Sequence, residues 1–541
     1  MKARLLYPNM DFDWRWAQLA AAERANRRAS IRSRQLPDVD PCAALPPNAE
    51  DLQRDLDLAP LFSAMAQDDD WIFEVSRRVL LEAVQADLEI IWYRQAVLQD
   101  CLQQPDVVRQ LYTLAVEVTE GRRGHHLGVL SRYPDWVLRD ALETLMDLLR
   151  PLRALHQLVA QYAPCFRAEG WKQFFTTIQV NLSAEYLTEV EGHLHELKFP
   201  HGVLLSAELG PAHKGTRYRL HRVPKLRRGL WDWWRDLFEA KPPVYRFELS
   251  PRDEAGAQAL GELRSRAIAS AVEALGQAAS HVRDFFAMLR AELAFYIGCL
   301  NLHEALIRRG YHTCFPQPAP VSERRLSFHG LYDVSLALTV DRPVIPNDLH
   351  ADGKTLLMIT GPNSGGKTTF LRSLGIAQLL MQAGAFVPAQ SFTASLCSGL
   401  FTHFRREEDI RLQSGKFDGE LARMSVIVDH LRSGAVLLCN ESFSATNERE
   451  GSEIARQLIQ AVTELGVRVY FVTHFYELAR SFYEKGLESA CFLRAERLQD
   501  GRRTYRILKG EPLATTYGED VYRRIFGVSC GVSHEETPTR T

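Results

Sequence analysis

The chain of 541 residues lacks any apolar run as long as the ~18 residues that a membrane-spanning helix needs. Its first residues, MKARLLYPNMDFDWRW, place acids and tryptophans where a signal peptide carries an apolar stretch. These two absences predict a cytoplasmic protein that does not contact a membrane.

Paired cysteines are also missing. Nine cysteines are scattered along the chain, and none forms a Cys-x-x-Cys pair. This spacing argues against a zinc site or a disulfide framework and suits a reducing compartment.

The chain has no excess of charge of one sign, since its net charge is −2. With 46% hydrophobic and 24% charged residues, it has the composition of an ordinary globular protein. A near-neutral total does not exclude a nucleic-acid partner, because a local basic patch is sufficient.

The distribution of prolines and of periodic segments predicts four regions. A helix with an arginine-rich end and a linker with four prolines occupy 1–70. A helical region covers 71–315, and strand-like sequences insert into it at about 200–250. Within it, 255–309 predicts one helix of roughly 75–80 Å if continuous. Alternating strand and helix signals predict an α/β domain at 320–527, and we predict a flexible tail at 528–541.

The most informative stretch is TLLMITGPNSGGKTTFLRSL, in which an apolar strand, a glycine-rich loop and a helix follow one another. The loop matches the P-loop pattern, whose amide groups and helix N-terminus cradle phosphates. We expect ATP to bind here, with Lys367 at the β- and γ-phosphates and the Thr368 hydroxyl on Mg²⁺. The predicted nucleotide-binding residues are Gly361, Pro362, Asn363, Ser364, Gly365, Gly366, Lys367, Thr368 and Thr369.

A second apolar strand, in AVLLCNESFSATNEREGSEIA, ends in Asn440-Glu441. Nucleotide hydrolases usually carry Asp-Glu at this point, where the first acid holds Mg²⁺ and the second activates water. Asn440 can still bind a metal-held water, but the lost unit charge is worth roughly 3 kcal/mol at ~5 Å with an effective dielectric near 20. Glu441 remains as the candidate general base. The alternative is an ordinary buried strand with a polar end.

His474 follows another apolar strand, in VRVYFVTHFYELA. A lone histidine is often structural, but P-loop ATPases of the ABC type place a γ-phosphate sensor here. We therefore include His474 with Glu441 as a candidate catalytic residue.

Several motifs in one order resemble the MutS family of DNA mismatch-repair ATPases. They are VIPNDLHADGKTLLMIT, GPNSGGKTT, AGAFVPAQ (383–390), LFTHFRREEDIRLQSGKFDGEL (400–421), NESFSATNEREGSEIA and VTHFYEL. The resemblance covers about 325 to 525. Upstream, IIWYRQAVLQDCL resembles the helical core of the family, and the 200–250 insertion resembles its DNA clamp.

The resemblance implies an α/β P-loop NTPase domain of the ABC type, joined to a helical lever with a small β clamp. It also implies a homodimer in which the 414–415 segment reaches the partner's nucleotide. When the segment is aligned with the family by Phe417 and Glu420, Gly415 takes the position of the family's key serine. Ser414 lies one position away, so either residue can serve as the one that reaches the partner's nucleotide. Before residue 330 there is no Phe-x-Glu motif of the mismatch-sensing members.

KGTRYRLHRVPKLRR (214–228) carries basic residues without an acid, and aromatic residues lie among and behind them. This composition suits contacts with a DNA backbone, and the location at the implied clamp tip favours them over a solvated hairpin face. The candidate DNA contacts are Lys214, Arg217, Arg219, Arg222, Lys225, Arg227 and Arg228.

Together these features predict a MutS-like ATPase that couples ATP binding and hydrolysis to movement of a clamp on duplex DNA. Two alternatives stay open. One is a nucleotide switch with little hydrolysis because of Asn440. The other is a dimerising ATPase scaffold for protein partners, without DNA.

Overall fold

The computed structural model describes residues 2–28, 45–121, 134–199, 204–209, 215–221, 254–406, 415–498 and 502–513. They divide into two compact units that interleave along the chain. The first unit holds Met1–Ala3, Arg109–Phe166 and Lys172–Arg290, and the second holds Arg4–Val108, Arg167–Trp171 and Ala291–Thr541.

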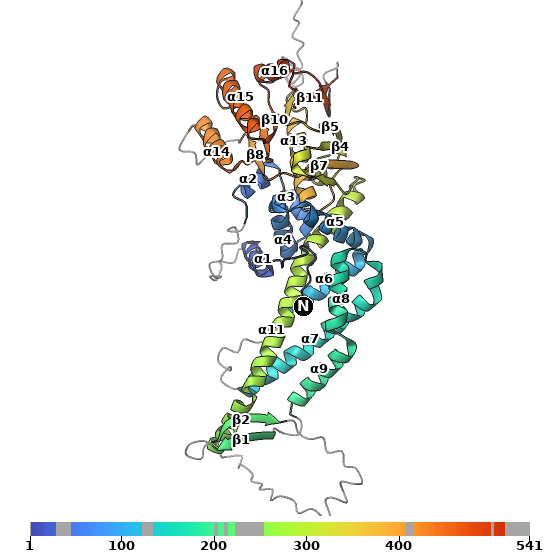
Figure 1. The fold of residues 1–541 in the computed structure, drawn as a ribbon, viewed down its shortest axis with the longest axis vertical. Coiled ribbons are helices and arrows are strands. Elements are labelled where there is room, and N and C mark those ends of the chain that lie inside the picture. Colours follow the sequence, from blue (N-terminus) through green and yellow to red (C-terminus); the bar gives the residue numbers. More distant parts are fainter. Residues whose placement is uncertain are drawn as a thin grey trace, which may run out of the picture. The chain divides into compact units, whose positions relative to one another are not determined.

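The first unit is helical and carries a hairpin of two strands (Figure 1). Leucines recur every three or four residues along its longest complete helix, and those at 142, 145, 148, 149, 152 and 155 are buried, which explains why this segment is helical. Apart from the first residues of α6 and α8, which belong to the second unit, its elements are α6 (Pro105–Glu120), α7 (Pro134–Tyr162), η3 (Ala163–Cys165), α8 (Glu169–Asn181), α9 (Ala184–Leu197), β1 (Leu204–Leu209) and β2 (Gly215–His221).

The hairpin confirms the strands predicted within 200–250. β1 and β2 are antiparallel, with Leu204 opposite His221. The third predicted strand, YRFELS at 245–250, lies outside the described residues, as does the 222–228 part of the basic stretch.

The long helix predicted at 255–309 is confirmed as a single element, α11 (Glu254–Arg308), of 55 residues. Its residues up to Arg290 belong to the first unit and the rest to the second. In the part of the chain that the structure describes, Ile268–Arg308 is the one segment long and apolar enough to span a membrane. Its most apolar window is entirely buried in the protein, as in the core helix of many proteins without a membrane span.

The second unit begins with short helices that precede the α/β region. Asp69 caps one of them by accepting hydrogen bonds from the amides of Trp71 and Ile72, which explains why this helix begins at the run of aspartates. The helices are α1 (Trp14–Arg28), α2 (Ala49–Asp55), α3 (Ala59–Ala66), α4 (Asp70–Leu81), η1 (Ala83–Gln85) and α5 (Leu88–Gln103).

A six-stranded sheet forms the centre of this unit, in the order β12-β11-β6-β10-β9-β8. All neighbours are parallel except β12, which is antiparallel to β11. The strands are β6 (Leu356–Thr360), β8 (Leu400–Phe404), β9 (Val436–Asn440), β10 (Arg468–Val472), β11 (Ala490–Arg497) and β12 (Arg503–Lys509). Because parallel strands end at the same edge, the segments after β6, β9 and β10 come together.

Helices cover both faces of this sheet (Figure 1), which explains why its strands are continuous apolar runs. On one face, Gly375 of α13 packs against Leu438 of β9. On the other, Leu437 and Phe471 share a core with the following helices. The helices are α13 (Lys367–Gln382), α14 (Lys416–His430), α15 (Glu448–Glu464) and α16 (Tyr476–Glu484). The fold class is thus the predicted one, a helical region followed by an α/β P-loop domain.

A second sheet lies in the same unit, with four strands in the order β3-β7-β4-β5. Its elements and their short neighbours are β3 (Gln317–Ala319), η5 (Val321–Glu323), β4 (Leu326–Leu331), α12 (Val334–Thr339), β5 (Asn347–His350) and β7 (Ser391–Ser395).

Seven cysteines fall among the described residues, and all of them are free thiols. Cys165 is exposed, whereas burial raises the pKa of the other six: Cys101, Cys299, Cys314, Cys397, Cys439 and Cys491. No pair of these thiols forms a disulfide.

Candidate functional site

The loop between β6 and α13 has the geometry of a phosphate cradle. Its backbone takes positive φ at Gly361 (119°), Ser364 (58°) and Gly366 (92°), the last of which is the N-cap of α13. A Cβ at Gly361 would lie 2.8 Å from the amide nitrogen of Ala495 on β11, so only glycine fits. The loop is therefore held tightly against β11, with the N-terminus of a 16-residue helix behind it.

Lys367 is 5% exposed, and its ammonium donates to the carbonyl oxygens of Gly361 (3.0 Å) and Pro362 (3.1 Å). Burial lowers the pKa of Lys367, and the nearby Glu441 carboxylate opposes that shift. The Lys367 side chain thus lies against its own loop, where phosphate oxygens would replace these carbonyl oxygens as hydrogen-bond acceptors.

Thr368 and Asn440 are brought together by the strand order. The Thr368 hydroxyl donates to the side-chain oxygen of Asn440 at 2.9 Å, across the carboxyl ends of β6, β10 and β9. Among the described residues no three His, Cys, Asp or Glu side chains form a metal cluster. Two neutral oxygens beside the Glu441 carboxylate fit a Mg²⁺ ion that takes most of its negative ligands from phosphates.

Glu441 lines the same pocket. Its φ of 53° is unusual for a residue other than glycine, and its amide donates to Val472 at 2.9 Å. This bond fixes the strained backbone beside β10. The carboxylate lies 3.9 Å from the Arg405 guanidinium, which follows β8.

His474 follows β10 at the same edge of the sheet, but it is not among the residues that line the pocket. Its ring packs edge-on against Phe475, with 4.7 Å between centroids. Of the two signature candidates, Gly415 is exposed and precedes α14, and Ser414 lies outside the described residues.

The pocket has a volume of about 690 Å³ and includes two walls that were not predicted from the sequence. One wall is α12 with the loop after it, and another is the start of β12. The end of that loop belongs to the family-like motif VIPNDLHADGKTLLMIT, but no motif in the sequence marks α12 or the start of β12 as part of a pocket. Besides residues 363–369 of the P-loop and Glu441, the lining residues are Leu331, Tyr332, Asp333, Leu336, Val340, Arg342, Pro343, Val344, Ile345, Asn347, Phe370, Ser373, Arg503, Thr504 and Tyr505.

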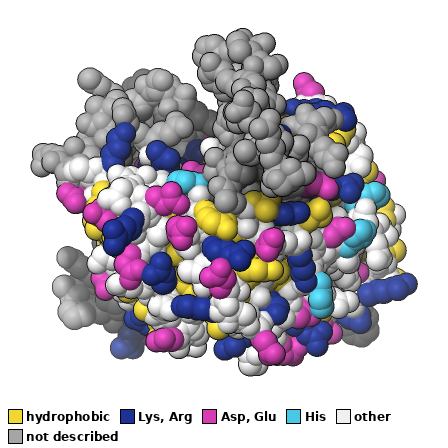
Figure 2. All heavy atoms as spheres, turned by 90° about the horizontal axis from the view of Figure 1, so that it is seen from above, with side chains coloured by type: hydrophobic (Ala, Val, Ile, Leu, Met, Phe, Trp, Pro, Cys, Tyr) yellow, Lys and Arg dark blue, Asp and Glu magenta, His cyan; other side chains and the backbone are white. Residues whose placement is uncertain are grey.

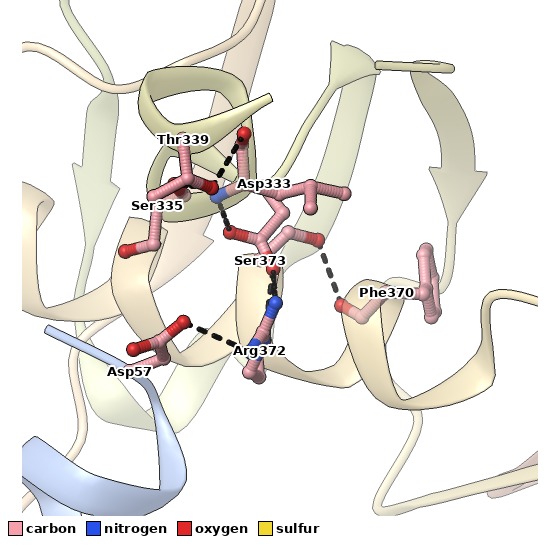
Figure 3. A network of polar contacts seen from close by, with 8 residues as sticks. Asp57, Asp333, Ser335, Thr339, Phe370, Arg372 and Ser373 are labelled. Carbon is pink, nitrogen blue, oxygen red and sulfur yellow. Dashed lines mark hydrogen bonds and ion pairs between the residues drawn. The ribbon is translucent and has the colours of Figure 1, made fainter. Parts of the chain in front are cut away.

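An ion-pair network supports the α12 wall (Figure 3). Asp333 caps α12 by accepting from the amide of Leu336, and its carboxylate binds the Arg372 guanidinium at 2.8 Å. Arg372, on the P-loop helix, also reaches Asp57 between α2 and α3 at 3.3 Å. Burial raises the pKa of Asp333, with Arg372 opposing. The phosphate loop, the pocket wall and the N-terminal helices are thus joined at one arginine.

The basic stretch is only partly described. Arg217 and Arg219 are exposed on β2, and Arg217 forms an ion pair with Glu208 of β1 at 3.1 Å. The candidates Lys214, Arg222, Lys225, Arg227 and Arg228 lie outside the described residues. On the face drawn in Figure 2, basic and acidic side chains are interspersed among the described residues, without a basic field.

Comparison with protein families matches two parts of the chain. Residues 86–309 match the MutS2 N-terminal domain, and residues 357–527 match MutS domain V, the ATPase domain of the family.

Individual relatives agree with these matches. The chain is 28% identical to the DNA mismatch repair protein MutS of Thermus aquaticus over 63% of this chain and 37% of that protein. It is 32% identical to MutS of Chlorobium phaeovibrioides over 34% of this chain and 21% of that protein. It is 28% identical to human MutS protein homolog 4 over 28% of this chain and 16% of that protein. The chain thus spans well under half the length of these relatives.

Proposed function

The chain belongs to the MutS family, and from that premise we propose that it binds and hydrolyses ATP to act on duplex DNA in repair or recombination. The observation that carries the proposal is one pocket lined by Lys367, Thr368 and Glu441, with Asn440 hydrogen-bonded to Thr368 beside the glycine-rich loop.

In the proposed mechanism, the loop amides and the N-terminus of α13 bind the β-phosphate, and Lys367 exchanges its two carbonyl partners for phosphate oxygens. Thr368 and Asn440 would hold Mg²⁺, which supplies positive charge to the phosphates. Glu441 accepts the proton of the attacking water, and its fixed backbone keeps the carboxylate at the pocket. His474 would contact the γ-phosphate after a local rearrangement.

The DNA partner is proposed from the family and from the basic hairpin. Clamp contacts would come from Arg219 and from the basic residues of 214–228 beyond the described hairpin. The absence of a Phe-x-Glu motif before residue 330 favours a preference for DNA structure or plain duplex over direct mismatch reading. We also propose a cytoplasmic homodimer, in which Ser414 or Gly415 completes the partner's nucleotide site.

A specific observation favours a second function, a nucleotide switch with little hydrolysis. Asn440 brings no negative charge to the metal, and Arg405 lies 3.9 Å from the Glu441 carboxylate that would act as base. Both features would slow hydrolysis without preventing nucleotide binding.

Steady-state ATP turnover with Mg²⁺, with and without duplex DNA, tests the proposal. Turnover that DNA stimulates and that Glu441→Gln abolishes is expected, with Lys367→Ala losing nucleotide binding itself. Binding without turnover in the wild type would favour the switch. Turnover that ignores DNA at every salt concentration would favour a scaffold for protein partners.

A further inference from the structure

Arg503 stands out among the charged groups around the pocket. It lies at the start of β12 and lines the same pocket as Lys367 and Thr368. Its Nε and Nη2 atoms are enclosed by protein and have no hydrogen-bond partner among the described residues. An enclosed donor of a charged group costs free energy when it is unsatisfied, so its position calls for an anion.

The backbone around Arg503 is fixed relative to the phosphate loop. Asn347 of β5 holds β12 from both sides of Arg506, because it donates to the carbonyl of Tyr505 (3.4 Å) and accepts from the amide of Ile507 (2.7 Å). A Cβ at Gly366 would lie 3.4 Å from the Tyr505 carbonyl oxygen, so β12 is in close contact with the last glycine of the loop.

The neighbouring strand makes the same contact. Ala495 of β11 packs on Gly361 and Gly365 of the loop, and Arg497 is paired in register with Arg503. The β11–β12 hairpin is therefore one wall of the phosphate site, in close contact with the glycines of the loop.

Charged side chains of both signs line the pocket. The cations are Arg342, Lys367 and Arg503, and the acids are Asp333 and Glu441. Since the Asp333 carboxylate is already bound by Arg372, a polyphosphate would add negative charge where the cations of the pocket lie.

We propose that Arg503 is a phosphate-binding residue, whose guanidinium holds the triphosphate chain from the β12 side while Lys367 holds it from the loop side. The inference rests on the proposed nucleotide site and adds a residue to it. A guanidinium suits this role, because its planar fork can donate two parallel hydrogen bonds to one phosphate group.

The test compares Arg503→Met with Lys509→Met, an exposed cation on the same strand that does not line the pocket. Affinities for ATP and for adenosine are measured by titration calorimetry, and thermal unfolding is followed with and without ATP. Loss of a charge-assisted hydrogen bond should weaken ATP binding about tenfold or more and leave adenosine binding unchanged. Lys509→Met should stay within about twofold of wild type.

Without nucleotide, Arg503→Met should melt at or above the wild-type temperature, because the apolar side chain removes two unsatisfied donors. Arg503→Lys, which keeps the charge, should recover part of the ATP affinity. The proposal is overturned if Arg503→Met binds ATP as the wild type does. An equal loss of ATP and adenosine with a lower melting temperature would overturn it as well, since that result assigns Arg503 to structure.

A failure of the proposed function has a different signature. If the wild type binds neither ATP nor ADP, the pocket is not a nucleotide site and the proposal for Arg503 fails with it. If the wild type binds ATP and only the Arg503 comparison fails, nucleotide binding stands without this residue.

Discussion

The hydrogen bond between Thr368 and Asn440 sets the chemistry available to a metal in this pocket. Both side chains offer neutral oxygens at 2.9 Å from each other, and Glu441 is the carboxylate that lines the pocket beside them. A hard divalent cation gains most from charged oxygen ligands, so its affinity here depends on the nucleotide more than on the protein.

Asn440→Asp should lower the Mg²⁺ concentration for half-maximal turnover by tenfold or more, because it restores a unit charge worth roughly 3 kcal/mol per facing charge at ~5 Å. A Mg²⁺ titration of ATP turnover measures the effect. Asn447→Asp is the matched control, since Asn447 caps α15 by accepting from Glu450, and an aspartate caps equally well. An unchanged Mg²⁺ requirement in Asn440→Asp would contradict this account.

Among the elements, α13 has two functions in the structure. Its first residues carry Lys367 and Thr368, and Arg372, one turn later, binds the buried Asp333 of the pocket wall. The Asp333 side chain is completely buried and that of Arg372 is 19% exposed, so the pair depends on both partners.

Arg372→Met should destabilise the unit by about 3 kcal/mol, because it leaves the Asp333 carboxylate buried without its cation. Thermal unfolding measures this, and the double variant Arg372→Met/Asp333→Asn should recover most of the loss. Asp57→Asn is the comparison, since Asp57 is 48% exposed and should change stability by well under ~1 kcal/mol. Equal melting temperatures for Arg372→Met and the wild type would show that the network contributes nothing.

The helix α11 is tied to the N-terminal segment through Glu292. Its carboxylate accepts hydrogen bonds from the amides of Arg4, Leu5 and Leu6, and the Tyr296 hydroxyl donates to the Leu5 carbonyl. Burial raises the pKa of Glu292 to about 7, against the lowering effect of the three amides.

The pKa of Glu292 in the folded protein lies above the ordinary value of 4.5. Its contribution to the free energy of unfolding is therefore present in full below about pH 4.5 and is lost as the pH rises through about 7. The loss is on the order of 3 kcal/mol. Glu292→Gln should remove this pH-dependent loss of stability. The melting temperature of the variant should therefore fall less between pH 5 and pH 8 than that of the wild type. Glu304→Gln, at an exposed position of the same helix, should keep the wild-type pH profile.

For the whole molecule, the balance of charges bears on the proposed DNA contact. The net charge is −2, and the face in Figure 2 mixes both signs, so the proposed attraction to DNA would need a local basic surface. The hairpin carries the exposed Arg217 and Arg219, but Glu208 already pairs with Arg217 there.

Arg219→Ala should reduce the slope of log affinity for duplex DNA against log salt by about 0.9, the value for one phosphate contact. Arg217→Ala should reduce it less, because Glu208 already neutralises part of that charge. Affinities measured by fluorescence anisotropy over a range of salt concentrations give both slopes. A flat salt response in the wild type would rule out this surface as the DNA contact.

The parts of the fold that follow local rules were predictable from the sequence. The strand, glycine loop and helix around Lys367 and the 55-residue α11 were predicted, because periodicity and spacing act over neighbouring residues. The hairpin wall with Arg503 and the Asp57–Arg372 pair were not predicted. Both join segments more than a hundred residues apart, and only packing brings them together. The roles of Glu441 and His474 stay predictions.

The distribution of thiols has a practical consequence for spectroscopy. Cys165 is exposed, whereas the other six described cysteines are buried or half-buried and their pKa values are raised, which keeps them in the unreactive thiol form. With Cys42 and Cys530 replaced by serine, a maleimide dye would therefore attach at Cys165 in the native protein. A single fluorophore on the helical unit would then test whether ATP changes the surroundings of that site, without a new cysteine being introduced.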